Sequence, residues 1–545
     1  MTAPDGPELI NNVPAGPESG QNRTEVVQGF FDAMLAYPQT ATVAREFLTP
    51  KAAATWRPEG LHVYDGQGVL PTPKGVSLLA RPIGSLDERG SWTSFEARKV
   101  RTSTDLRLMR KDGQWRIVNP PAGTYVNQEY FDRYYDAFSL YFFDPTRRVL
   151  TPDPVYLLLG ETTATQLVAG LLQGPTKRLS DVLSESTPGG TGVDLSVSTS
   201  EAGVAEVPLT DNFLQLSEED RQLFAAQITW TLRQIAEIER ISLTVDGSTI
   251  NVPGVGPVFG VDEFSGFDPA GLGASWTLFA QGRNGVVSVD EEGASPVTGL
   301  ANYPGVVRSA AVDARAALAA LVVDGGRTVV VDAIGGGDEE DASPWFTGGT
   351  DLLKPSWDVH GVLWLVDRTS RGARIWAVTQ EGRRAVRAPG LAGATLESFA
   401  VSRDGVRMVA IVSAAGMSRL VISLIDRDPG DPTTVSLRSP HGVFGDEFEL
   451  ADSSQVAWSS PTSVAVLGRS DGSREEPVDI SIDGSSQTTT GGYLPARPVS
   501  IAAGPNEDAP VAYGTANGRI YVRSPDSLWV PFGGSKRLTS PFYPG

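Results

Sequence analysis

The second half of the chain repeats a short motif about every 45 residues. Six anchor motifs can be aligned, and they are FDPAG at Phe267, VDARA at Val312, WDVHG at Trp357, VSRDG at Val401, VAWSS at Val456 and IAAGP at Ile501. Their first residues are 45, 45, 44, 55 and 45 positions apart. The runs that follow the motifs, such as LAALVVDGGRTVVVDA, have the pattern strand, turn, strand. A period of this length with several strands in each unit is typical of a β-propeller.

We therefore predict an all-β propeller of about six blades over residues 254–545. A single blade cannot bury both of its faces, so neighbouring blades arranged around an axis complete the core. The irregular spacing of 55 residues would be one blade with a longer loop. The alternative is a pair of β-sandwiches, which the even spacing makes less favourable.

The first folded segment has a different pattern. From Glu25 onward, apolar residues follow helical spacing on one face, and they include Val27, Phe30, Phe31 and Met34. Strand-like runs follow, and the last pair is joined by the turn sequence KDGQ at residues 111–114. Helices before a curled antiparallel sheet resemble the NTF2-like cone, an α+β fold. We assign residues 23–128 to this domain and expect its own side chains to fill the interior. Residues 1–22 read as a flexible tether.

The segment 129–253 predicts a small α/β module. The apolar run 155–159 suits a buried strand, and a helix with inward-facing Leu167 and Leu171 stops at Gly174-Pro175. A long helix then follows from the N-cap Ser217 to about Arg240, and the strand ISLTVDG comes after it. The pattern LLxGP, QITWTL and VDG resembles the GerMN module of spore-germination and envelope lipoproteins. That resemblance implies a binding module without established catalytic residues.

Composition excludes several classes of function. The chain of 545 residues has a formal net charge of −20, so general nucleic-acid binding is disfavoured. It has no cysteine, which excludes disulfides, thiolate zinc sites and a cysteine nucleophile. No run of 18 apolar residues predicts a membrane span, and the first twenty residues lack the features of a signal peptide.

We find no catalytic, cofactor-binding or metal-binding set. His62, His360 and His441 lie in different segments without metal-ligand spacing, so we expect isolated structural histidines. No GxSxG or GxxxxGK motif occurs, and GVGPVFG at residues 254–260 reads as a linker entering the propeller. The acidic run at residues 338–341 is interpreted as a solvated loop rather than a calcium site.

Two groups of residues in the predicted propeller suggest other functions, one catalytic and one in partner binding. Asp262, Asp313 and Asp358 could point into a central channel, as a glycan hydrolase or lyase would require, although Asp at such positions commonly caps turns. Tryptophans cluster in one blade, where we expect Trp364 and Trp376 to pack in the core. We place Trp345 on a loop and select it as the candidate contact for a partner.

The order of tether, NTF2-like domain, GerMN module and propeller resembles the actinobacterial LpqB lipoproteins along essentially the whole chain. The supporting sequences are DGQWRIVNPP, LYFFDPTRRVLTPDPVYLLL, LLQGP, QITWTL and VDG, together with the propeller motifs. The family's lipid-carrying cysteine and signal sequence are missing from this chain, so the anchor is an inference from the resemblance.

The resemblance implies a lipid-anchored protein on the outer face of the cytoplasmic membrane. It also implies contact with the extracytoplasmic domain of a sensor histidine kinase of the MtrB type, modulation of an MtrAB-type system, and a role in envelope homeostasis and cell division. The alternatives are the glycan hydrolase or lyase, and a small-ligand sensor that uses the NTF2-like pocket.

Overall fold

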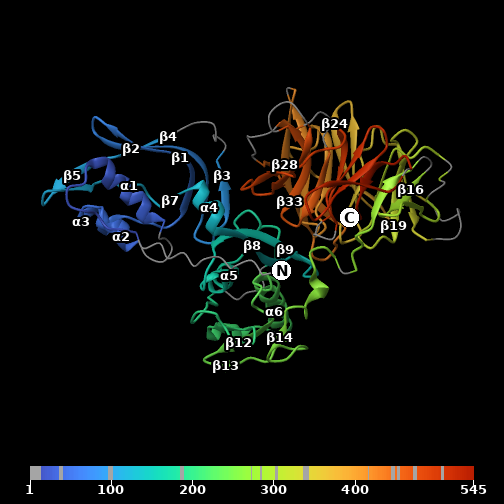
Figure 1. The fold of residues 1–545 in the computed structure, drawn as a ribbon. Helices are drawn as coiled ribbons and strands as arrows, with labels where there is room; N and C mark the ends of the chain where they lie inside the picture. The colour runs from blue at the N-terminus through green and yellow to red at the C-terminus, as the bar shows by residue number, and fades with distance from the viewer. Residues whose placement is uncertain are drawn as a thin grey trace. The chain divides into compact units, whose positions relative to one another are not determined.

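The computed structural model shows a multidomain, mostly β protein (Figure 1). It describes residues 14–35, 41–95, 102–184, 190–271, 273–282, 285–300, 303, 305–335, 343–414, 416–443, 449–450, 455–469, 475–504, 509–534 and 536–545. Within these ranges no helix is long and apolar enough to cross a membrane. The chain divides into two compact units, one made of Met1–Ser139, Pro154–Gln173 and Gly192–Thr199, the other of Leu140–Asp153, Gly174–Thr191 and Ser200–Gly545.

The first unit begins as an α+β domain, as predicted. Its elements are α1 (Arg23–Met34), α2 (Thr42–Glu46), α3 (Pro50–Thr55), β1 (Leu61–Thr72), β2 (Gly75–Leu86), β3 (Trp92–Ser94), β4 (Thr102–Leu106), β5 (Leu108–Lys111), β6 (Gln114–Ile117), β7 (Thr124–Asn127) and α4 (Gln128–Tyr134). The sheet has the order β3-β2-β1-β7, and β4 also pairs with β2. The sheet is not wholly antiparallel, because β7 returns beside β1 in the parallel direction.

The predicted amphipathic face of α1 is confirmed. Its buried residues include Val27, Phe30, Phe31 and Met34, which share one cluster with side chains of β2 such as Leu78. These aromatic and aliphatic side chains fill the space between the helices and the sheet. The predicted hairpin is also present, since β5 pairs with β6 across a turn in which Asp112 and Gly113 have positive φ.

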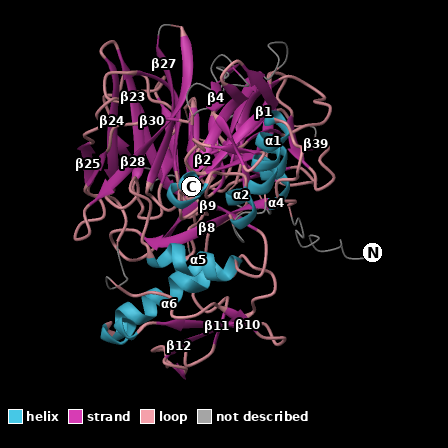
Figure 2. Cartoon of the chain, turned by 90° about the vertical axis from the view of Figure 1, so that its left-hand side faces the viewer, coloured by secondary structure: helices cyan, strands magenta, loops and turns pink. Residues whose placement is uncertain are grey.

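In the sequence, the strands and helices of an α/β module follow this domain and precede the propeller. They are β8 (Tyr135–Phe143), β9 (Leu150–Leu158), α5 (Thr163–Leu172), β10 (Ser198–Thr199), β11 (Val204–Leu209), the 3₁₀ helix η1 (Asp211–Gln215), α6 (Glu218–Leu232), β12 (Arg240–Val245), β13 (Ser248–Thr249) and β14 (Phe259–Gly260). Strands β11 and β12 are parallel, and α6 forms the crossover that a parallel pair requires (Figure 2).

Two predictions for this module need correction. The Ser217 hydroxyl caps α6 as expected, but the helix ends at Leu232 rather than near Arg240. The sequence pattern suggested a longer helix because the apolar residue Ile238, which lies in the turn after α6, is also buried. The segment GVGPVFG is not only a linker, since its last two residues form β14 and pair with β12.

The second half of the chain folds into sheets of four or five antiparallel strands. The described residues form six such sheets: β15 (Leu278–Gln281), β16 (Val286–Val289), β17 (Ala294–Pro296) with β40 (Thr539–Phe542); β18 (Ser309–Val312), β19 (Leu318–Val323), β20 (Thr328–Ala333), β21 (Ser343–Phe346); β22 (Ser356–Trp357), β23 (Leu363–Thr369), β24 (Gly372–Thr379), β25 (Gly382–Ala385); β26 (Thr395–Val401), β27 (Arg407–Ala414), β28 (Met417–Arg427), β29 (Val435–Leu437), β30 (His441–Gly442); β31 (Glu449–Leu450), β32 (Val456–Ser460), β33 (Ser463–Arg469), β34 (Glu476–Ser481), β35 (Gln487–Thr489); and β36 (Pro498–Ala502), β37 (Ala512–Thr515), β38 (Ile520–Arg523), β39 (Trp529–Phe532).

Four of the six anchor motifs lie in the first strand of a sheet, and a fifth lies in β32, which follows the short strand β31 of the same sheet. Val312, Trp357, Val401, Val456 and Ile501 lie in β18, β22, β26, β32 and β36. The motif at Phe267 is the exception and lies in the short 3₁₀ helix η2 (Ser265–Phe267). The corresponding position in the first sheet is taken by β40, from the end of the chain. The prediction was wrong there because the ring closes through a strand that is distant in sequence.

Hydrophobic clusters join each sheet to the next. One cluster contains Trp364 of β23 and Met408 of β27, and another contains Leu467 of β33 and Ile501 of β36. The ring is closed by a cluster that joins residues of β15 and β16 to residues of β37 and β38. The predicted mode of stability, in which neighbouring blades bury each other's faces, is therefore confirmed.

Candidate functional site

Polar turns follow the innermost strands of the propeller. Asp313, after β18, accepts hydrogen bonds from the backbone N–H groups of Ala317 and Leu318 at 2.7 and 2.6 Å. Asp358, after β22, accepts in the same way from His360 and Val362 at 2.9 and 3.0 Å. These carboxylates satisfy backbone donors that the turn would otherwise leave unpaired, which is the capping role expected from the sequence.

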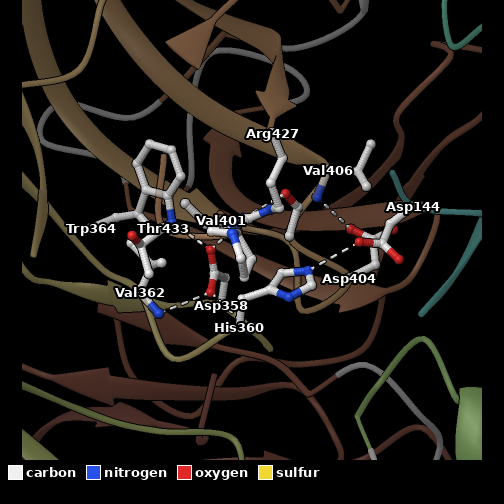
Figure 3. Close-up of polar contacts among 12 residues, drawn as sticks. Asp144, Asp358, His360, Val362, Trp364, Val401, Asp404, Val406, Arg427 and Thr433 are labelled. Carbon is white, nitrogen blue, oxygen red and sulfur yellow. Dashed lines mark hydrogen bonds and ion pairs between the residues drawn. The ribbon is translucent and has the colours of Figure 1, made fainter. Parts of the chain in front are cut away.

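Asp358 is also the centre of a buried ion pair. Its second oxygen accepts from Arg427 Nη2 at 2.6 Å and from Trp364 Nε1 at 2.9 Å (Figure 3). The two charged side chains are 2% and 0% exposed. Both oxygens of the Asp358 carboxylate are thus used, one to fix the turn and the other to join Trp364 of β23 to Arg427 of β28.

The loop between β8 and β9 carries a second buried carboxylate, Asp144. Its oxygens accept from the Thr146 hydroxyl at 2.6 Å and from the backbone N–H groups of Arg148 and Val149 at 3.0 and 3.1 Å. Burial alone would raise the pKa of Asp144, but the interactions with His360 and Thr146 hold it below its ordinary value. Asp144 is therefore a fixed negative charge with a defined orientation.

The Asp144 loop contacts the turns of the propeller through side chains that are far apart in the sequence. His360 Nε2 lies 3.3 Å from Asp144 Oδ2, and both side chains are almost fully buried (Figure 3). Arg407, at the start of β27, donates from Nη2 to the carbonyl oxygen of Pro152 at 2.5 Å and from Nη1 to Asp404 at 3.2 Å. Side chains and carbonyl groups of the β8–β9 loop and of the propeller turns therefore form one polar network within the second unit.

Two neighbouring residues complete this network. Gly405 has a φ of +72°, which favours glycine, and a Cβ there would lie close to Arg427 Nη2, at 3.0 Å, and to His360 Cδ2, at 3.2 Å. His441 is packed near Arg178 and Arg407, and burial together with these two charges lowers its pKa to about 4. His441 is consequently neutral at physiological pH.

A cavity of about 230 Å³ lies among the inner strands of the propeller. Each of the six sheets contributes lining residues, for example Ser309 of β18, Val401 of β26 and Ile501 of β36. Neither Asp313 nor Asp358 lines it, and Glu397 is the only carboxylate side chain among the lining residues that the structure describes. The pair of channel carboxylates that a glycan hydrolase or lyase would need is thus not found among those residues.

The remaining sequence candidates do not form one common site in the described part of the chain. Trp345 is on strand β21, not on a loop as predicted, and its partly buried ring packs edge-on against Trp357 at 5.7 Å. Trp364 is fully buried as expected, and Trp376 is partly buried in the same cluster as Trp345. Asp262 pairs with Arg233 at 3.2 Å on the surface. The acidic run 338–341 lies outside the described residues.

The three histidines do not form a common site. The His62 ring packs at a tilt against Tyr125, with 4.8 Å between the ring centroids, and burial lowers the pKa of His62. Across the described part of the chain, no group of three or more His, Asp or Glu side chains is arranged to hold a metal ion. Sequence reasoning missed Asp144 and Arg407, because a charged residue in a polar loop carries no periodic signal of burial.

Comparison with known proteins agrees with this architecture. The family model described as "Lipoprotein LpqB beta-propeller domain" matches residues 284–544, and "Lipoprotein LpqB, N-terminal domain" matches residues 16–132. The model described as "Sporulation and spore germination" matches residues 139–251 between them. The chain belongs to the LpqB lipoprotein family. The GerMN-like module and the propeller predicted from the sequence are thereby confirmed.

Curated members of the LpqB family match nearly the full length of the chain. Lipoprotein LpqB of Cutibacterium acnes is 26% identical over 96% of this chain and 92% of its own length. Lipoprotein LpqB of Thermobifida fusca is 26% identical over 98% of this chain and 92% of its own length. Lipoprotein LpqB of Streptomyces avermitilis is 27% identical over 96% of this chain and 90% of its own length.

Proposed function

We propose that this chain is a non-catalytic lipoprotein of the cell envelope that binds the extracytoplasmic domain of a two-component sensor kinase. The lipid anchor, the position on the outer face of the cytoplasmic membrane and the MtrB-like partner come from the family resemblance. The main support is the domain order shared with LpqB lipoproteins over nearly the whole chain.

The geometry of the second unit favours binding over catalysis. The carboxylates of Asp313 and Asp358 are used to fix turns, and buried contacts such as Arg407 to Pro152 hold the β8–β9 loop against the propeller. A closed ring of sheets with its loops fixed in this way loses little conformational freedom on association. Such preorganisation favours protein–protein contact, because less entropy opposes binding.

The test is titration calorimetry of the full chain against the isolated extracytoplasmic domain of the kinase. We expect saturable binding at micromolar strength or tighter, about −8 kcal/mol or better. Trp345→Ala tests the candidate contact, and Trp115→Ala is the matched control because Trp115 is also partly buried but lies in the first unit.

Loss of affinity in Trp345→Ala alone would assign the contact to the propeller near β21. Equal affinity in both variants would remove Trp345 from the interface. No binding heat at high concentration, with both proteins shown to be folded by circular dichroism, would exclude direct contact between the two soluble parts and contradict the proposed function.

A further inference from the structure

Basic side chains line the propeller channel of a chain whose formal net charge is −20. The charged groups among its lining residues are the side chains of Arg308, Lys354 and Arg403, against the side chain of Glu397 and the α-carboxylate of Gly545. An acidic surface repels large polyanions, whereas cations inside a narrow channel attract small ones that can enter it. Three of the four charged side chains that line the channel are therefore cations, although the molecule as a whole is acidic.

Lys354 is the cation without a compensating acid. Arg308 forms an ion pair with Asp351, which also pairs with Arg368 at 2.6 Å. Within the described ranges Lys354 has no hydrogen-bond acceptor or carboxylate partner. Its Nζ lies 5.0 Å from the centre of the Phe542 ring, which is a cation–π contact.

The surroundings of Lys354 explain how it is both exposed and desolvated. Its side chain is accessible to water, since it borders the cavity, but protein atoms surround it on the other sides. This burial lowers the pKa of Lys354 from 10.5 to about 8. An anion placed in the cavity would stabilise the charged ammonium and reverse that shift.

Three residues that line the cavity also carry buried polar atoms without hydrogen-bond partners. Ser309 Oγ and Arg403 Nη1 are buried and form no hydrogen bond, although Arg403 Nη2 donates to the carbonyl oxygen of Pro544. Glu397 Oε2 is buried and unpaired as well, while its Oε1 accepts from the Ser418 hydroxyl at 2.9 Å. Because most buried polar groups are hydrogen-bonded, the two donors indicate a partner that carries acceptor oxygens.

We propose that the propeller channel binds a small oxyanion, a phosphate or carboxylate group, which pairs with Lys354 and accepts hydrogen bonds from Ser309 and Arg403. The cavity of about 230 Å³ is smaller than the roughly 300–1,000 Å³ of pockets for drug-sized ligands, so the ligand is a compact one. Glu397 Oε2 would accept from a hydroxyl group of that ligand, which favours a hydroxylated anion over a simple ion.

The first experiment measures binding of inorganic phosphate, glycerol phosphate and lactate to the full chain, by calorimetry at constant ionic strength set with chloride. We expect saturable binding of at least one of them. Lys354→Met should raise its Kd at least tenfold, and Lys354→Arg should restore much of the affinity. Lys74→Met is the control, because Lys74 is exposed in the turn between β1 and β2 and should leave the Kd unchanged.

A second variant guards against a folding defect. Ser309→Ala removes one donor without changing charge, and we expect it to weaken binding severalfold while the thermal midpoint without ligand stays the same. Binding of equal strength in wild type and Lys354→Met would overturn the proposal. The proposal would also be contradicted if none of the three probes showed saturable binding at constant ionic strength.

The protonation of Lys354 gives an independent readout. With ¹³C-labelled lysine, the Cε resonance that disappears in Lys354→Met reports its titration. We expect a pKa near 8 without ligand and a higher pKa, toward the ordinary value of 10.5, at saturating ligand. A pKa that the bound anion leaves unchanged would show that the anion binds elsewhere and would contradict the assignment to Lys354.

Discussion

At the scale of single residues, burial decides what a charged contact contributes. The Arg427–Asp358 pair is almost fully buried, and both partners have further hydrogen bonds. The pair of Arg438 and Asp181 has similar geometry at 2.9 Å, but its side chains are 39% and 63% exposed. Removing one partner of a buried pair leaves a charge that water cannot reach, whereas an exposed partner is simply hydrated.

Asp144 and Asp181 allow a matched comparison, since both contact propeller side chains from outside the repeats. We expect Asp144→Asn to lower the free energy of unfolding by about 1–3 kcal/mol, because His360 and the turn donors lose a charged acceptor. Asp181→Asn should cost less than about 1 kcal/mol, because solvent screens the Arg438 pair. Urea denaturation measures both, and equal losses would show that Asp144 is no more than a surface contact.

His441 makes the second unit sensitive to acid. Its pKa is about 4 in the folded chain and about 6.5 when unfolded, so the unfolded state binds the extra proton between these values. Stability is therefore lost as the pH falls through this window, by about 2 kcal/mol between pH 6.5 and pH 5.

The neutral variant His441→Asn should lose correspondingly less stability than wild type over the same pH interval. The measurement is the free energy of unfolding at pH 7, 6 and 5 for both proteins. Parallel curves for the two proteins would show that protonation of other groups, and not of His441, accounts for the acid sensitivity.

At the scale of elements, the first sheet of the ring is completed by a strand from the end of the chain. β40 pairs with β15, and Phe542 stacks on Phe279 with ring centroids 5.9 Å apart. Since β40 supplies the innermost position of a sheet whose other strands come from residues 278–296, the propeller cannot close until the whole chain is present. This contact has the highest sequence separation of any strand pair in the described ring.

Phe542→Ala tests this closure. The side chain is 2% exposed, and we expect the substitution to cost about 3–5 kcal/mol. Phe532→Ala on the outer strand β39 is the control and should cost less, because Phe532 is only partly buried. Thermal unfolding with limited proteolysis checks both. A loss in Phe542→Ala no larger than in the control would contradict the closing role of β40.

At the scale of the whole molecule, the propeller does not end at the boundaries of its repeats. Residues 140–153 and 174–191 belong to the same compact unit as the ring. The buried guanidinium of Arg407 finds one of its two acceptors, Pro152, in that added segment. A fragment that begins at residue 254 would leave this donor and His360 without their partners.

We accordingly expect a fragment of residues 254–545 to be less stable than one of residues 129–545. The loss of the charged hydrogen bond from Arg407 alone corresponds to about 1.5–3 kcal/mol. Chemical denaturation followed by tryptophan fluorescence compares the two fragments. Equal midpoints would show that the ring folds independently of the β8–β9 loop.

The sequence by itself determined the features that depend on local repetition and local chemistry. The 45-residue period located five inner strands, the helical stripe of α1 identified Phe30 and Phe31 as core, and Ser217 marked the start of α6. The helical stripe and the N-cap lie within a few residues of the structure that they specify, because helical periodicity and capping act over one or two turns. The 45-residue period is a repetition of such local strand and turn signals.

Only the tertiary structure decided the contacts between distant segments. The position of β40 in the first sheet, the packing of Trp345 on β21, the approach of Asp144 to His360 and the channel around Lys354 leave no pattern in the sequence. A polar or aromatic residue has the same letter whether it is solvated or buried. Its partner is set by how the ring closes, and ring closure depends on the free energy of the whole packed chain rather than on any local propensity.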